Sequence, residues 1–449
     1  MKSIKIGCGA GYAGDRIEPA IEMMEKSDID YIAFECLAER TIAIAQQEKM
    51  KNPQKGYNHL LEYRMRKILP ICKSKNIKVI TNMGAANPEG AIRKIKEIAQ
   101  ELNIKGLKIA AVIGDNIYDN ISKYMDMKVL ETEKPLKELE GEIVSANAYL
   151  GVDGILQALE NDSDIIITGR VADPALFLAP MIYEFNWSLE DYEKIGKGTL
   201  IGHLLECGGQ ITGGYFADPG YKDVDDLYKL GFPIANVYKN GDAIITKVQG
   251  SGGKVTESTC KEQLLYEIHD PKRYITPDVI ADFSNVSIQQ IDNDQVQISG
   301  GNGIEKTDTL KASIGYFDCF IGEGEISYGG PGAYERAKLA GKIVEKRLKM
   351  LNISTKELRI DLIGINSLYK DQISNTLSSS IAPEVRLRVA ARTKSKENAT
   401  TIGNEVEALY TNGPAAGGGA TKSVKKIISM ASIFIPRKDI DTNILYEEV

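Results

Sequence analysis

Acidic and basic side chains that could transfer protons, and an amide that could bind a ligand, lie just after short apolar segments of this sequence. Glu35, Asn82, Asp115 and Arg170 each follow such a segment. If the segments are parallel strands, their carboxyl ends form one ligand crevice, and these side chains converge there. The pattern therefore predicts acid–base chemistry on a small ligand. The alternative is that these loops need Gly, Asn and Asp only for turns and helix caps.

Glu35 and Glu39 are the first candidates for the acid and the base. They stand four positions apart at the end of one apolar segment, and Arg40 follows directly. Two carboxyls in different environments can divide acid and base duties, because burial raises one pKa and a neighbouring Arg lowers the other. Arg40 is a candidate for substrate binding. An ordinary Glu–Arg surface pair is the alternative.

Arg170 and His203 complete the candidate catalytic set. Arg170 follows the apolar run Ile165-Ile166-Ile167, where its guanidinium would bind a carboxylate at the mouth of the crevice. His203 and Glu206 lie one helical turn apart, a spacing that suits proton transfer or metal ligation. A His packed for structural reasons remains the alternative.

The first loop is rich in glycine and formally matches a dinucleotide-binding fingerprint. Gly9, Gly11 and Gly14 have the G-x-G-x-x-G spacing, and Glu35 follows about 20 residues later. The same glycines could instead seat a phosphate or carboxylate at a helix N-terminus, with Arg16 as a further anion-binding residue.

Two amide and carboxylate residues extend the predicted substrate site, and the cysteines do not define a metal site. Asn87 and Asp115 lie in later loops of the same kind. Cys36 and Cys207 could belong to a cluster, but the chain has no CxxC pair, so we assign neither metal nor cofactor.

The elements that must position these residues alternate between strand and helix patterns, which predicts an α/β fold with a doubly wound, mainly parallel sheet. The predicted strands are residues 4–8, 31–35, 77–82, 107–113 and 164–168. The predicted helices between them are residues 15–26, 58–73, 87–102 and 147–160.

The pattern changes near residue 190, which predicts two domains. We expect an α/β domain over residues 1–188 and a mixed α+β domain over residues 189–449. The second domain should contain helices near 332–351 and 399–410 and strands at 358–363, 385–391 and within 427–435.

Composition narrows the class of ligand. The chain has 449 residues and a net charge of -7 without a basic block, so we expect no nucleic-acid or membrane surface. Six widely spaced cysteines and an N-terminus without a signal-peptide pattern indicate a reduced, cytoplasmic protein.

Several blocks of this sequence resemble the acyclic terpene utilisation (AtuA-type) family, in order and over most of the chain. They are GAGYAGDRI (9–17), FECLAERT (34–41), TNMGAANP (81–88), TGRVAD (168–173), GHLLECG (202–208) and GEGEISY (322–328). The resemblance implies a role in the catabolism of branched unsaturated acids. Cys8 and Cys319 depart from the family pattern, so these thiols are not assigned a shared function.

Many relatives carry an added C-terminal ferredoxin-like domain, and this sequence is expected to lack it. A separate small subunit of that fold could supply it, and a homo-oligomer is expected.

Three functions remain open at this point. The first is a hydro-lyase acting on a branched short-chain unsaturated acid of the mesaconate and citramalate type, or on its CoA thioester. In it Glu35 or Glu39, His203 and Arg170 supply base, acid and carboxylate binding. The second is a non-catalytic binding or scaffold subunit of an acyl-CoA-processing complex. The third is an NAD-dependent oxidoreductase.

Overall fold

The chain forms two compact units in the computed structural model, which describes residues 2–377 and 382–449. Unit 1 contains the residues up to Leu139, then Ile143–Tyr316 and Met430–Val449, and unit 2 contains Glu140–Glu142 and Phe317–Ser429. These bounds differ from the expected division after residue 188, because residues 189–316 belong to unit 1.

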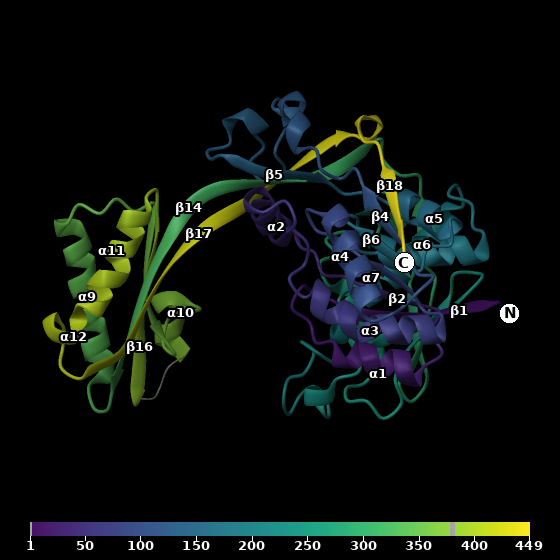
Figure 1. The fold of residues 1–449 in the computed structure, drawn as a ribbon. Helices are drawn as coiled ribbons and strands as arrows, with labels where there is room; N and C mark the ends of the chain where they lie inside the picture. The colour runs from purple at the N-terminus through teal and green to yellow at the C-terminus, as the bar shows by residue number, and fades with distance from the viewer. Residues whose placement is uncertain (1, 378–381) are drawn as a thin grey trace. The chain divides into compact units, whose positions relative to one another are not determined.

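Unit 1 contains most of the strands (Figure 1). They are β1 (Ser3–Ala10), β2 (Tyr31–Phe34), β3 (Lys78–Thr81), β4 (Lys108–Ile113), β5 (Ile143–Ala148), β6 (Ile165–Thr168), β7 (Pro233–Tyr238), β8 (Ala243–Lys247), β9 (Tyr274–Ile275), β10 (Ile280–Asp282), β11 (Ser287–Asp292), β12 (Gln295–Ser299), β13 (Asn302–Ile304) and β18 (Asn443–Glu448). Two longer strands, β14 (Thr309–Gly329) and β17 (Gly417–Pro436), run through both units.

The helices of unit 1 connect these strands. The α-helices are α1 (Glu18–Lys26), α2 (Glu39–Lys51), α3 (Leu61–Lys75), α4 (Pro88–Glu101), α5 (Asp153–Glu160), α6 (Ala175–Phe185), α7 (Tyr192–Glu206) and α8 (Glu257–Leu265). Short 3₁₀ helices are η1 (Tyr118–Tyr124), η2 (Leu136–Glu138), η3 (Gly208–Gln210), η4 (Leu227–Lys229) and η5 (Arg437–Asp439).

The main sheet is mixed, with the strand order β11-β12-β8-β7-β1-β2-β3-β6-β4-β18. Its five central strands, β1, β2, β3, β6 and β4, pair in parallel, and antiparallel strands extend it on both sides. The predicted α/β fold and its five strands are confirmed. The sheet is mixed and not mainly parallel, because antiparallel strands flank the parallel ones, and the doubly wound arrangement stays a prediction.

Both faces of the central sheet are packed in apolar cores, which explains its continuous hydrophobic strands. Along β2, Tyr31 and Ala33 join a core with α5, α6 and α7, whereas Ile32 and Phe34 join another with α1, α3 and α4. This alternation is the two-residue period of a strand. The central strands are therefore held rigidly, and their carboxyl ends are fixed in position.

Local sequence signals explain several element boundaries. The Asn87 side chain accepts a hydrogen bond from the Gly90 N–H at 3.1 Å and caps α4, with Pro88 in the first turn. The helix predicted at residues 147–160 begins only at Asp153. The preceding residues form β5, which pairs with β14, a contact distant in sequence.

Unit 2 has the β-α-β-β-α-β order of ferredoxin-like folds, with α10 added between its second and third strands and the short α12 added before its last strand. Its elements are the end of β14, α9 (Ala333–Met350), β15 (Glu357–Ile363), α10 (Lys370–Leu377), β16 (Glu384–Thr393), α11 (Lys396–Glu407), α12 (Leu409–Asn412) and the start of β17. The strand order is β15-β16-β14-β17, and α9 and α11 lie side by side on β16. The helices and strands predicted for this region are present, but their ferredoxin-like arrangement within the chain was not predicted.

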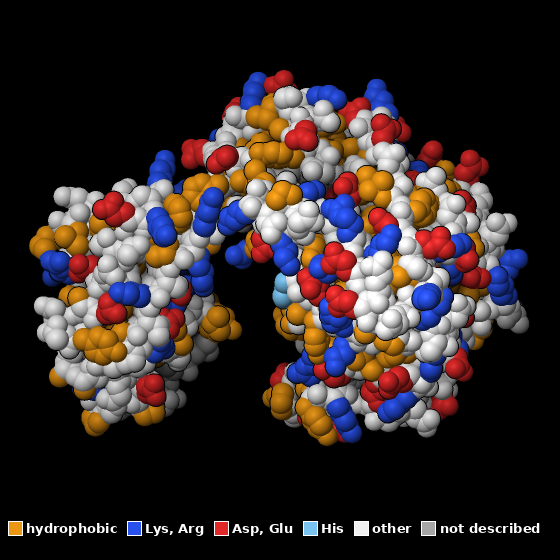
Figure 2. Space-filling view, in the orientation of Figure 1, with side chains coloured by type: hydrophobic (Ala, Val, Ile, Leu, Met, Phe, Trp, Pro, Cys, Tyr) orange, Lys and Arg blue, Asp and Glu red, His pale blue; other side chains and the backbone are white. Residues whose placement is uncertain are grey.

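The visible surface carries Lys and Arg side chains interspersed with Asp and Glu (Figure 2). Interspersed charges of both signs are usual on protein surfaces in water. Among the described residues, no helix combines the length and apolar composition needed to cross a bilayer.

Candidate functional site

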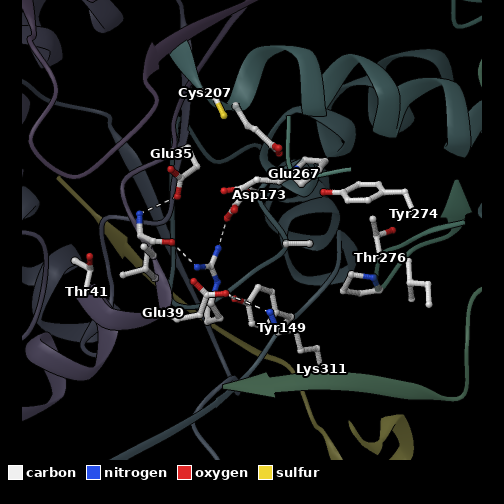
Figure 3. A pocket seen from close by; sticks show the side chains of 18 of the residues that line it. Glu35, Glu39, Thr41, Tyr149, Asp173, Cys207, Glu267, Tyr274, Thr276 and Lys311 are labelled. Carbon is white, nitrogen blue, oxygen red and sulfur yellow. Dashed lines mark hydrogen bonds and ion pairs between the residues drawn. The ribbon is translucent and has the colours of Figure 1, made fainter. Parts of the chain in front are cut away.

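Unit 1 contains a cavity of about 550 Å³ at the carboxyl ends of β1, β2 and β6. Its polar lining comes from the loops after these strands, from the start of α2, from the end of α7, from the segments after β5 and α8, and from β9 and β14. The polar and charged lining side chains are Tyr12, Glu35, Glu39, Thr41, Tyr149, Arg170, Asp173, Glu206, Cys207, Tyr266, Glu267, Tyr274, Thr276, Thr309 and Lys311. In Figure 3, Glu39, Tyr149 and Lys311 gather on one side, and Cys207 and Glu267 lie on the other.

Glu35 is a buried carboxyl that reaches the cavity from the end of β2. Its Oε1 accepts hydrogen bonds from the Leu37 N–H and from the Asn82 side chain, both at 2.8 Å. Burial raises the pKa of Glu35 to about 8, helped by Asp173 and opposed by Arg170. Glu35 is therefore mostly protonated at neutral pH and is poised to donate a proton.

Arg170 is fixed in the wall of the cavity and is only 1% exposed. Its backbone N–H donates to Asp115 Oδ2 at 3.0 Å, and its guanidinium donates to the Val171 carbonyl, the Leu37 carbonyl and Asp173. These contacts use most of its donors, so the predicted binding of a substrate carboxylate by Arg170 is not what this geometry favours. Arg170 instead orders the loops around Glu35 and supplies positive charge.

Glu39, Tyr149 and Lys311 form a second group of contacting side chains in the cavity. The Tyr149 hydroxyl donates to Glu39 Oε1 at 2.5 Å, and Lys311 Nζ lies 3.2 Å from the same oxygen. The Lys311 ammonium and the Arg170 guanidinium flank the Tyr149 ring at 4.9 and 4.6 Å from its centroid. Although burial works against it, these partners lower the pKa of Glu39 to about 2. Glu39 is thus a permanent anion that orients Tyr149 and Lys311.

Glu206 and His203 lie one turn apart at the end of α7. His203 Nδ1 is 2.9 Å from Glu206 Oε1, and His203 itself is 1% exposed and absent from the cavity lining. Burial raises the pKa of Glu206 to about 7, because removal from water outweighs the neighbouring imidazole. The predicted His203 therefore lies behind a carboxyl that faces the cavity.

Of the remaining predicted residues, some hold Glu35 and Arg170 in place, and others lie away from the cavity. Asn82 and Asp115 are buried behind the cavity, where they hold Glu35 and Arg170. Asn87 caps α4 and also donates to the carbonyls of residues 53 and 55, so it has a structural role. Arg16 and Arg40 are exposed and do not line the cavity, and Arg16 donates to the Tyr228 carbonyl.

The glycine-rich loop is shaped by close packing. A Cβ on Gly11 would lie 2.2 Å from the Cys207 carbonyl carbon, and one on Gly9 would lie 2.5 Å from the Phe34 ring. The Gly11 N–H already donates to Asp15 at 2.9 Å, and α1 begins only at Glu18. A dinucleotide site would need free N–H groups running directly into a helix, so this geometry does not favour the NAD interpretation. Gly11 lines the cavity, whereas Gly9 and Gly14 do not.

Within the described residues, no group of three or more His, Cys, Asp or Glu side chains is placed to hold a metal ion. Cys36 is buried and accepts a hydrogen bond from Arg64 at 2.9 Å, while Cys207 lies in the cavity wall.

A family model described as "Acyclic terpene utilisation family protein AtuA" matches residues 4–446 of the chain. The chain belongs to the AtuA family. The expected resemblance is thereby confirmed, and all residues of the cavity fall within the matched range. No curated protein and no solved structure matched the chain.

Several residues of this AtuA family cavity were not predicted from the sequence. Tyr149 follows β5, and Lys311 belongs to β14, more than 140 residues later. They meet because β5 pairs with β14, and no sequence signal marked that pairing. Glu206 had a signal, its spacing from His203, but only the structure shows that Glu206 is the member of the pair that faces the cavity.

Proposed function

We propose that this AtuA family protein is a hydro-lyase that adds water to, or removes it from, a short branched unsaturated carboxylic acid or its thioester. One observation carries the proposal. Glu35, a buried carboxyl with a raised pKa, shares a small cavity with the ion pair of Glu39 and Lys311. Addition of water across a conjugated double bond needs a proton donor and a cation near the developing negative charge.

We assign to Glu35 the donation of a proton to the α-carbon of the substrate. When water adds to the β-carbon, one of its protons leaves to an acceptor and negative charge moves onto the carboxylate or thioester carbonyl. The α-carbon then takes the proton of Glu35, so that H and OH are added and no redox partner is needed. Since its pKa is raised to about 8, Glu35 holds that proton at neutral pH.

We assign to Lys311 the binding of the substrate carboxylate or thioester carbonyl. Its side chain is 39% exposed, so its ammonium is more accessible than the enclosed guanidinium of Arg170. Glu39 and Tyr149 fix its position without leaving the cavity wall. A substrate carboxylate or thioester carbonyl at Lys311 would gain charge stabilisation as the reaction proceeds.

The rest of the lining supports a partly apolar substrate. Leu310, Pro277, Ile275 and Phe434 line the cavity together with the polar groups. A cavity of about 550 Å³ lies within the usual range for small-molecule sites. Both features suit a branched carbon chain with one anionic end.

The test is a hydration assay with the full chain and a panel of short enoic acids and their CoA thioesters, followed by loss of enoate absorbance. We expect turnover that declines as pH rises through about 8, where Glu35 loses its proton. Lys311→Met should raise KM at least tenfold, while Lys197→Met, a lysine of α7 outside the cavity, serves as the control. No turnover of any acid or thioester would reject the hydro-lyase and favour a binding or scaffold subunit.

A further inference from the structure

Both ring nitrogens of His203 have a partner, whereas one carboxyl oxygen of Glu206 has none among the described residues. His203 Nε2 lies 3.2 Å from the Leu264 carbonyl, and its ring packs against Tyr274 and Phe283 with centroids 5.6 and 5.9 Å away. Glu206 Oε1 contacts His203, but the buried Oε2 of Glu206 has no hydrogen-bond partner. A buried polar atom without a partner is costly, and this one belongs to a residue that lines the cavity.

Hydrogen-bond chemistry restricts where the protons are. A carbonyl only accepts, so His203 Nε2 must carry a hydrogen toward Leu264. His203 Nδ1 and Glu206 Oε1 must then share one proton. Two protons between these atoms would clash, and with no proton two hydrogen-bond acceptors would be in contact. The pair is either imidazolium with carboxylate or neutral imidazole with carboxylic acid.

From this geometry we infer that Glu206 is a second catalytic acid–base residue: its unpartnered Oε2 takes a proton from the attacking water, while His203 takes up the proton of Oε1 from behind. The inference deepens the hydro-lyase proposal and rests on it for the reaction. Glu206 would touch the water, and His203 acts only through Glu206 and is therefore a positioning residue.

The surroundings favour retention of a proton by the pair. Asp173, Glu267, Cys207 and Tyr274 face it from four separate segments, and the two carboxyls raise the affinity of Glu206 for a proton. Asp173 is itself held by Arg170. No described cation other than His203 is in hydrogen-bond or ion-pair contact with Glu206.

The two carboxyls then complete a balanced reaction. As the water oxygen bonds to the β-carbon, one of its protons passes to Glu206 Oε2, and the proton on Oε1 moves onto His203 Nδ1. Glu35 gives its proton to the α-carbon. After the product leaves, the extra proton of the pair is lost to solvent and Glu35 regains one, so that only water has been added.

Proton sharing can be tested on the resting protein, without any substrate. The chain has three histidines, so NMR of ¹³Cε1-labelled histidine resolves His203 once His203→Asn has identified its signal. We expect His203 to titrate above the ordinary pKa of about 6.5. In Glu206→Gln the imidazole should stay neutral across the same range, because burial would no longer be opposed by a carboxylate, and the two remaining backbone contacts are smaller influences on its pKa. Glu193→Gln, an exposed glutamate of the same helix, is the matched control.

Activity supplies the second measurement. Glu206→Gln should lower kcat at least a hundredfold and remove the acid limb of the pH profile, whereas His203→Asn should shift that limb and retain some turnover. A His203 titration that is unchanged in Glu206→Gln would overturn the inference, as would full kcat in that variant. Absence of hydration by the wild-type protein would reject the proposed function alone, since the NMR result does not depend on turnover.

Discussion

Glu35 in unit 1 differs from Glu323 and Glu325 in unit 2 in how deeply its carboxyl is buried and in whether a cation contacts it. In the cavity of unit 1, Glu35 is buried and makes hydrogen bonds only to an N–H and an amide. On β14 in unit 2, Glu325 Oε2 is 2.5 Å from Arg386 Nε, and Glu323 is paired with Arg388. The unit 2 carboxyls are 21–22% exposed and each has a cation in direct contact.

The difference shows that burial and pairing, and not residue type, decide what a carboxyl can do. A paired and partly hydrated carboxylate stays ionised and contributes modestly to stability. A buried carboxyl without a contacting cation keeps its proton until high pH and can donate it. We therefore assign chemistry to Glu35 of unit 1 and structural roles to Glu323 and Glu325 of unit 2.

The strongest test of this contrast replaces one glutamate from each unit by glutamine. Glu35→Gln should lower hydration activity by about 10²–10⁴-fold, the usual contribution of a general acid. Glu325→Gln should leave activity within twofold of the wild type. Comparable losses in both variants, measured as kcat on the best substrate of the panel, would remove the distinction between the two units.

Alkaline stability gives the next largest effect. Because the folded pKa of Glu35 is raised to about 8, its stabilising contribution is present below its ordinary pKa of about 4.5 and is lost as pH rises through about 8. Relative to the wild type, Glu35→Gln should therefore gain a few kcal/mol of stability between pH 5 and pH 9, because a tenfold change in proton affinity corresponds to about 1.4 kcal/mol. Urea unfolding at both pH values measures this. An equal difference between the two proteins at pH 5 and pH 9 would contradict the raised pKa.

Backbone packing at the cavity predicts a smaller loss. Gly11→Ala places a Cβ 2.2 Å from the Cys207 carbonyl carbon, so it should reduce the free energy of unfolding by about 1–3 kcal/mol. Gly14→Ala meets only the flexible Tyr12 side chain at 3.0 Å and is the control. Thermal unfolding compares the two. If Gly11→Ala is as stable as Gly14→Ala, the loop is not held against Cys207 as described.

The smallest effect is expected on the sheet of unit 2. Glu325→Gln breaks an ion pair whose partners are 22% and 30% exposed, so the free energy of unfolding should fall by about 0.5–1 kcal/mol. The loss should shrink in about 1 M salt, where exposed charges are screened. The equivalent measurement on Glu35→Gln should show little dependence on salt. A large decrease in the free energy of unfolding that does not depend on salt would show that Glu325 behaves as a buried carboxyl does.

The fold of the first 185 residues was largely predictable. Each of the five predicted strands coincides with an observed strand to within two residues at either end, because apolar β-branched runs bounded by turn residues are a local signal. β5 was missed, since its residues pair with β14 and carry no comparable apolar run. The mixed character of the sheet also depends on β7 and β18, which join it from distant parts of the chain.

The candidate site was predicted in outline only. Glu35, Glu39 and Arg170 line one cavity, because parallel strands deliver their following loops to the same edge. Arg40 and Arg16 follow the same kind of loop but lie on the surface. Side-chain direction in a loop depends on packing that no local pattern encodes.

The sequence by itself determined the family, the parallel strands of the central sheet and the edge at which polar residues gather, because these follow from local patterns and matched blocks. Only the tertiary structure decided which carboxyl keeps a proton. The raised pKa of Glu35 and the lowered pKa of Glu39 arise from burial and from Tyr149 and Lys311. Burial and contacts between charges depend on which residues meet in the folded chain, and those residues are far apart in the sequence.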